Sequence, residues 1–169
     1  MSKDKKEEEE VDYKFMDDEE ELNGVMEYEY KNVKDCGILE YGFDIKFPKE
    51  NDYKKWLMLM KAPEDSDYSG GKYIIEVEFL MDYPYINPKF TFKEPILYHC
   101  NVKDNGELDV NWMMKGMKID YIMPRLLTLF YLQDTEGNDS ERSKLYKENK
   151  EQFIKNIKEN VEKTKNVKF

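Results

Sequence analysis

The sequence has very few of the residues that form disulfides and metal centres. Among 169 residues there are two cysteines, Cys36 and Cys100, and one histidine, His99. Two cysteines without a paired spacing make neither a disulfide framework nor a zinc site, and a lone histidine lacks fellow ligands. We therefore expect no metal and no cofactor, and a reducing setting in the cytoplasm or nucleus.

Basic residues and long apolar runs are scarce as well. Lys and Arg number 27 against 37 Asp and Glu, which gives a net charge of -10 and a pI near 4.8. Affinity for nucleic acid comes chiefly from cations that neutralise phosphates, so this balance argues against a nucleic-acid partner and suits protein partners. No stretch approaches the roughly 18 apolar residues of a membrane span, so we expect no membrane insertion.

Apolar and aromatic residues, by contrast, are abundant enough for a core. Hydrophobic residues make up 40% of the chain and aromatic residues 14%, which is too much apolar surface for a disordered protein. Charged residues dominate the start of the chain. We predict a flexible charged tail over residues 1–16 and one core domain over residues 17–169.

Short apolar runs separated by turn-forming residues fill much of this domain. An acidic opening followed by apolar residues at helical spacing predicts a helix from Asp17 to about Lys34. Four predicted strands rich in aromatic and branched side chains follow, at Ile38–Phe47, Trp56–Lys61, Tyr73–Phe79 and Phe90–Phe92. Their regular spacing favours one antiparallel meander.

Helical periodicity returns in the last third of the chain. Apolar residues three or four apart from Ile122 to Phe130 predict a helix, a polar loop spans Gln133 to Ser140, and an amphipathic stretch runs from Leu145 to Val161. A helix, four strands and further helices make an α+β domain.

An ordered set of motifs links these elements to a known family. In chain order they are Trp56, Ala62-Pro63, Tyr68, Gly70-Gly71, Asp82-Tyr83-Pro84, Pro88-Lys89, the turn Tyr98-His99-Cys100-Asn101, Gly106, Trp112 and Leu126-Leu127. This set resembles the catalytic core of ubiquitin-conjugating enzymes. The resemblance implies their fold, from about Asp17 to the C-terminus.

Asp109 stands where the resemblance implies a catalytic cysteine. In that family a cysteine after the turn receives the C-terminus of ubiquitin as a thioester, because a thiolate is both a strong nucleophile and a good leaving group. Counted from Gly106, its place falls on Asp109. In an alternative alignment, Asp109 is an aspartate that follows a deleted cysteine. Either way the nucleophile is lost, since no cysteine lies between Asn101 and the C-terminus.

The turn keeps two of the three residues of the family's His-Pro-Asn turn. Asn101 matches the asparagine that steadies the oxyanion, whereas Cys100 replaces a proline. Cys100 is either a displaced nucleophile or a small, partly buried substitute, and we favour the latter because its neighbour Asn101 would be poorly placed to assist it. His99 is expected to hold the turn through backbone hydrogen bonds, and Cys36 to pack at the end of the first helix.

Two noncatalytic branches of the family fit a missing cysteine. Ubiquitin-conjugating enzyme variants dock on an active conjugating enzyme and bind ubiquitin. The run from Gly106 to Val110 is more similar to fused-toes proteins, which are adaptors for coiled-coil Hook proteins on transported vesicles. The leading hypothesis is an inactive adaptor of this kind. A conjugating enzyme that uses Cys100 is the remaining alternative.

Partner-binding residues are predicted from two loops that bind ubiquitin ligases in the family. Tyr85 retains an aromatic residue in the first loop, and Met113, Met114 and Lys115 replace the usual Ser-Pro-Ala of the second. Methionine repacks easily against varied partners, so Met113, Met114 and Met117 are candidates for an adaptable binding patch. The alternative is packing in the core, which is the more common role of methionines after a tryptophan.

Overall fold

The computed structural model describes residues 18–110 and 115–169. In chain order its elements are α1 (Asp18–Asp35), the short 3-10 helix η1 (Ile38–Tyr41), β1 (Phe43–Lys46), β2 (Lys55–Lys61), β3 (Lys72–Glu78), β4 (Lys89–Phe92), α2 (Ile119–Leu127), the 3-10 helix η2 (Thr128–Phe130), α3 (Glu141–Glu148) and α4 (Lys150–Thr164). The predicted α+β order is therefore confirmed. The predicted tail, residues 1–16, lies outside the described residues and stays a prediction.

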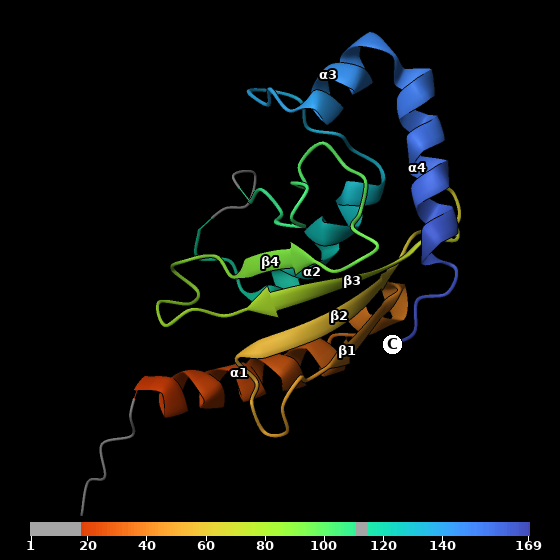
Figure 1. Cartoon of the computed structure of the whole chain (residues 1–169). Coiled ribbons are helices and arrows are strands. Elements are labelled where there is room, and N and C mark those ends of the chain that lie inside the picture. The colour runs from red at the N-terminus through yellow and green to blue at the C-terminus, as the bar shows by residue number, and fades with distance from the viewer. Residues whose placement is uncertain (1–17, 111–114) are drawn as a thin grey trace, which may run out of the picture.

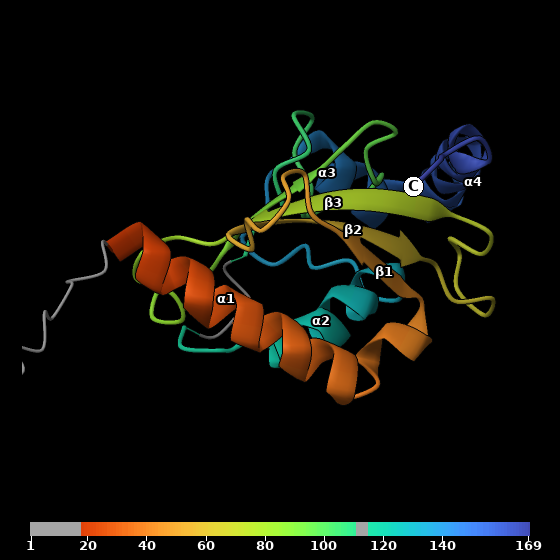
Figure 2. The same cartoon turned by 90° about the horizontal axis from the view of Figure 1, so that it is seen from below.

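The four strands form one antiparallel sheet in the order β1-β2-β3-β4, as expected for a meander. Ile75 at the centre of β3 lies opposite Met58 of β2 and Phe92 of β4. Because strand side chains alternate between faces, one face collects the buried residues Trp56, Met58, Met60, Tyr73, Ile75 and Val77. Helices α1 and α2 lie together against one side of the sheet, and α4 stands at its end (Figures 1 and 2).

The first predicted strand is shorter than the sequence suggested. Ile38–Tyr41 forms η1, and only Phe43–Lys46 joins the sheet. Gly42 separates the two with a φ of 105°. Glycine adopts this left-handed conformation readily, and it interrupts the strand. The pattern of apolar residues ran through this corner, so it gave no sign of the break.

The last amphipathic stretch is two helices rather than one. Asn149 has non-helical backbone angles (φ -148°, ψ 76°) and ends α3, and its side chain accepts the N–H of Gln152 to cap α4. A side-chain cap offsets the loss of helical hydrogen bonds at such a corner. Leu145 and Phe153 therefore lie on different helices, although their spacing fits one stripe.

A carboxylate occupies a core position on α1. The buried stripe of this helix is Leu22, Met26, Glu29 and Val33, and Glu29 is only 3% exposed. Its carboxylate lies 3.3 Å from Nζ of Lys118, which precedes α2, while Oε2 is buried without a hydrogen-bond partner among the described residues. Burial raises the pKa of Glu29 above its ordinary value, and the ammonium of Lys118 opposes this shift.

Replacing Glu29 with leucine is expected to stabilise the fold near neutral pH by about 1 to 3 kcal/mol, because the half-exposed ammonium of Lys118 only partly offsets the desolvation of the buried carboxylate. A raised native pKa means that stability falls as pH rises through it, so the gain should shrink toward pH 4. Urea unfolding at pH 7.5 and pH 4.5 measures both effects. Glu27→Leu on the exposed side of α1 is the control, and an equal gain there would contradict the account.

Candidate functional site

The turn at residues 98–102 is held by its only histidine. His99 is fully buried; its Nδ1 accepts the N–H of Asn101 at 3.0 Å, and Nε2 lies 2.7 Å from the carbonyl oxygen of Leu132. This pair of contacts places the proton of a neutral ring on Nε2, which donates to Leu132. Burial lowers the pKa of His99 to about 4, so the ring is neutral at physiological pH. Because both ring nitrogens are hydrogen-bonded to backbone groups, His99 fixes the backbone of the turn.

Cys100 is enclosed by the loop that follows η2. The residue is 4% exposed; its N–H donates to Oε1 of Gln133 at 2.9 Å, and its carbonyl oxygen accepts from Nδ2 of Asn138 at 2.8 Å. Burial raises the pKa of the thiol to about 11. Since only the thiolate is an effective nucleophile, a pKa four units above neutral leaves roughly one molecule in 10,000 reactive at pH 7.

Cys36 differs from its prediction. It was expected to pack, but it is exposed, with Sγ 3.3 Å from the carbonyl oxygen of Val33 at the end of α1. The stripe of buried residues on α1 ends at Val33, and Cys36 lies beyond it in the turn. Hence it is the exposed thiol of the chain.

Asp109 lies directly beside the turn. Its N–H donates to the carbonyl oxygen of Asn101 at 2.8 Å, and the two preceding contacts of this segment pair Gly106 and Leu108 with β4. Gly106, with a φ of 86°, makes the turn that starts the segment. The structure thus brings Asp109 and Asn101 together, as the resemblance implied for the family's nucleophile and asparagine.

A pocket of about 330 Å³ opens next to Asp109. The turn, the half-buried Asp109 and the loop over residues 134–140 line it. Oδ1 of Asn101 accepts the N–H of Asp134 at 3.2 Å, so the asparagine side chain joins the turn to this loop. Asn101 itself is 6% exposed.

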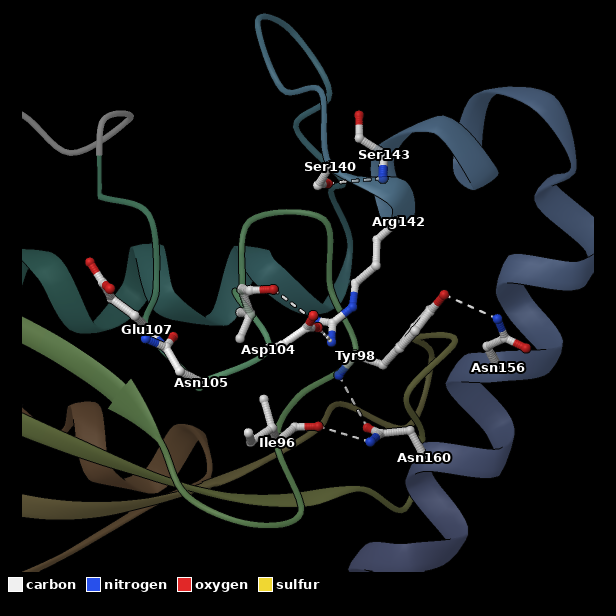
Figure 3. A network of polar contacts seen from close by, with 11 residues as sticks. Ile96, Tyr98, Asp104, Asn105, Glu107, Ser140, Arg142, Ser143, Asn156 and Asn160 are labelled. Carbon is white, nitrogen blue, oxygen red and sulfur yellow. Dashed lines mark hydrogen bonds and ion pairs between the residues drawn. The ribbon is translucent and has the colours of Figure 1, made fainter.

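Arg142 of α3 fixes the loop over the turn (Figure 3). Its guanidinium donates to the carbonyl oxygen of Val102 and to a carboxylate oxygen of Asp104, each at 2.6 Å, and it lies over the ring of Tyr98, 5.0 Å from the centroid. A planar guanidinium suits such combined contacts. No pattern in the sequence pointed to this role, because Arg142 lies among polar and charged residues at the start of α3.

Two asparagines of α4 complete the network (Figure 3). Nδ2 of Asn156 donates to the hydroxyl of Tyr98 at 3.0 Å; Asn160 accepts the N–H of Tyr98 and donates to the carbonyl oxygen of Ile96. Asparagines four apart share one helix face, and here that face meets the segment before the turn. That i,i+4 spacing was the one signal in the sequence that pointed to them.

A comparison with known protein families agrees with this arrangement of the turn and Asp109. Residues 26–161 of the chain match the profile of the ubiquitin-conjugating enzymes. The chain belongs to the ubiquitin-conjugating enzyme family. The α+β architecture predicted for this family is therefore confirmed, with its N-terminal helix, four-stranded antiparallel sheet and C-terminal helices.

Individual relatives carry the same family name. A probable ubiquitin-conjugating enzyme of Arabidopsis thaliana is 32% identical over 115 residues, which cover 64% of this chain and 73% of the relative. A probable ubiquitin-conjugating enzyme of Acanthamoeba polyphaga mimivirus is 30% identical over 138 residues, covering 78% and 86%. A ubiquitin-conjugating enzyme of Candida glabrata is 29% identical over 122 residues, covering 69% and 72%.

A backbone contact joins the segments around Tyr85 and Lys115, which the resemblance assigns to ligase-binding loops. The N–H of Gly116 donates to the carbonyl oxygen of Pro84 at 3.0 Å, which brings the neighbouring residues Tyr85 and Lys115 to the same part of the surface. Tyr85 is 79% exposed and Lys115 is exposed too. Met113 and Met114 lie outside the described residues, so their place in a binding patch stays a prediction.

Within residues 18–110 and 115–169, no three His, Cys, Asp or Glu residues are placed to hold a metal ion. A search of the same residues finds no helix that is long and apolar enough to span a membrane.

Proposed function

We propose that this member of the ubiquitin-conjugating enzyme family carries no thioester and acts as a protein-interaction adaptor. The observation that supports it is Asp109, which lies against Asn101 where the family's cysteine is expected. A carboxylate is a weak nucleophile, and the acyl anhydride that it would form with ubiquitin hydrolyses readily. The site keeps the shape of a transfer centre without a carrier for the acyl group.

The two cysteines of the chain do not supply that carrier. Cys100 is buried, and both its backbone groups are bound by Gln133 and Asn138, so moving its thiol outward would break this part of the turn. Its raised pKa further lowers its reactivity. Cys36 is exposed, but it lies just after α1, on a different segment of the chain from the turn that holds Asn101.

A charging assay tests the proposal. The protein is incubated with activating enzyme, ATP and ubiquitin and run on a gel without reductant, alongside Cys100→Ala and Cys36→Ala. No adduct that a thiol reagent removes is expected in any of the three. An adduct present in the wild type and in Cys36→Ala but absent from Cys100→Ala would reject the proposal and establish Cys100 as a displaced nucleophile.

For the adaptor's partner, we propose a coiled-coil protein of the Hook type. The similarity of Gly106–Val110 to fused-toes proteins supports this choice. The alternative is a ubiquitin-conjugating enzyme variant, which the family membership supports equally at the level of fold. Affinity purification separates them: an adaptor of the first kind copurifies with a long coiled coil, whereas a variant copurifies with an active conjugating enzyme and shifts ubiquitin amide resonances.

A further inference from the structure

Strand β1 is a free edge of the sheet (Figure 1). Among the described strands it pairs only with β2, whereas β4 at the opposite edge is hydrogen-bonded to Gly106 and Leu108. An edge strand directs every second N–H and C=O group away from the sheet, where another strand can pair with it. The edge of β1 lies across the sheet from the segment that leads to Asp109.

The register shows which residues of β1 point outward. The N–H of Lys61 on β2 donates to the oxygen of Gly42 at 2.8 Å, and bonded pairs recur at every second residue of an antiparallel ladder. Ile45 and Phe47 therefore direct their backbone groups away from β2, and among the described residues no other segment is hydrogen-bonded to them. Phe43 has the same orientation but is only 2% exposed, so the open part of the edge is the half-buried pair Ile45 and Phe47.

A pocket of about 820 Å³ surrounds this edge. On the side of the sheet that α1 covers, it is lined by Tyr30 and Leu39, which pack against the core. On the outer side it is lined by Leu59 and by Phe169, whose ring lies under the ammonium of Lys46 at 4.7 Å. Side chains of an added strand alternate between the two faces of a sheet, so both sides of the pocket can receive them.

The charges in this pocket favour an acidic occupant, although the whole chain has a net charge of -10. The charged lining residues are Lys46, Lys61, Lys72, Glu40 and Asp44. Lys61 and Asp44 form an ion pair at 2.8 Å. Within the described residues neither Lys46 nor Lys72 has a carboxylate partner, so two ammonium groups remain against one carboxylate. Complementary charge across an interface selects the partner and its register.

We propose that β1 accepts an extended segment of a partner protein as a fifth, antiparallel strand, with apolar side chains toward Tyr30 and acidic side chains toward Lys46 and Lys72. Main-chain hydrogen bonds to the edge supply affinity, and the alternation of side chains supplies specificity. The inference does not rest on the proposed loss of the thioester, because this edge is opposite to the one beside Asp109.

A peptide titration of the full chain, followed by NMR, tests this proposal. The probe is a capped peptide of sequence Val-Glu-Val-Glu-Val, which matches the apolar and basic sides of the pocket. It is expected to shift the amide resonances of Ile45 and Phe47 saturably and to slow their hydrogen exchange. Bonded partners in an antiparallel pair share a face, so the valine N–H groups should pair with β1. N-methylation of the valines should therefore weaken binding by about tenfold, whereas N-methylation of the glutamates should not.

Two protein variants make the test specific. Ile45→Pro removes an outward N–H and no bond to β2, so the variant should stay folded and lose the peptide. Lys72→Glu should weaken the glutamate peptide by about threefold and strengthen a matched Val-Lys-Val-Lys-Val peptide. Lys89→Glu on β4, at the opposite edge, is the control and should change neither affinity.

Three results would overturn the proposal. The first is the absence of saturable shifts with the glutamate peptide, and the second is binding that survives N-methylation of the valines. The third is slow exchange of the Ile45 and Phe47 amides in the free chain, because the edge would then be covered already by this chain or by a second copy. The methylated peptides leave the protein unchanged, so they give an answer even if Ile45→Pro fails to fold.

Discussion

A Gly106→Ala variant is expected to lose about 3 kcal/mol or more of unfolding free energy. A Cβ at this position would lie 2.1 Å from the carbonyl oxygen of Phe92, and the φ of 86° is unfavourable for alanine. The two segments are pinned together because the N–H of Phe92 donates to the oxygen of Gly106 at 2.7 Å. Overpacking and backbone strain each cost roughly 1 to 3 kcal/mol, and the neighbour here is rigid backbone.

Urea unfolding measures this loss, and Gly24→Ala is its matched control. Gly24 lies within α1 with no atom near its missing Cβ, so alanine there should stabilise the protein by about 0.5 to 1 kcal/mol. The change in unfolding free energy on substitution by alanine is therefore expected to have opposite signs at the two glycines. Equal, small effects at both positions would mean that the turn before Asp109 is not packed against β4 as described.

Stability should fall by about 2 kcal/mol between pH 7.5 and pH 5 because of His99 alone. Its native pKa of about 4 lies below the usual value of 6.5, so between these two values the unfolded chain binds a proton that the native protein does not. The contribution is complete above pH 6.5 and is lost as pH falls toward 4. Each pH unit in this window costs about 1.4 kcal/mol.

Two measurements check this prediction. Because His99 is the only histidine of the chain, its ring resonances report its native pKa without ambiguity. Urea unfolding of the wild type and His99→Gln at pH 7.5 and pH 5 gives the energetic part, and the variant should be less stable at pH 7.5 but lack the fall assigned to the ring. A native pKa near 6.5 would contradict the buried, neutral His99.

Local sequence patterns predicted those helices and strands whose side-chain pattern is regular from one end to the other. The strands β2 and β3 were recognised because each is a short run rich in aromatic and branched residues between turn-forming residues, and α1 because its acidic start favours a helix N-terminus. The break at Gly42 and the corner at Asn149 were missed, since a backbone change at one residue leaves the spacing of apolar side chains intact. Glu29 was missed because burial of a charge depends on Lys118, far along the chain.

The candidate site likewise has one part that the sequence predicted and another that it did not. The proximity of Asp109 to the turn follows from a short connection through Gly106, so the motif alone pointed to it. The enclosure of Cys100 by Gln133 and Asn138 joins segments more than 30 residues apart. Such contacts are set by how α3 docks, which no local periodicity encodes.

We propose that this ubiquitin-conjugating fold lacks any thiol able to carry an acyl group. Intact-protein mass spectrometry after incubation with activating enzyme, ATP and ubiquitin tests it most directly, with an active conjugating enzyme in a parallel reaction as the positive control. The control is expected to gain one ubiquitin, while this 20.4 kDa chain keeps its mass. A mass increase of one ubiquitin that dithiothreitol reverses, and that disappears in Cys100→Ala, would contradict it.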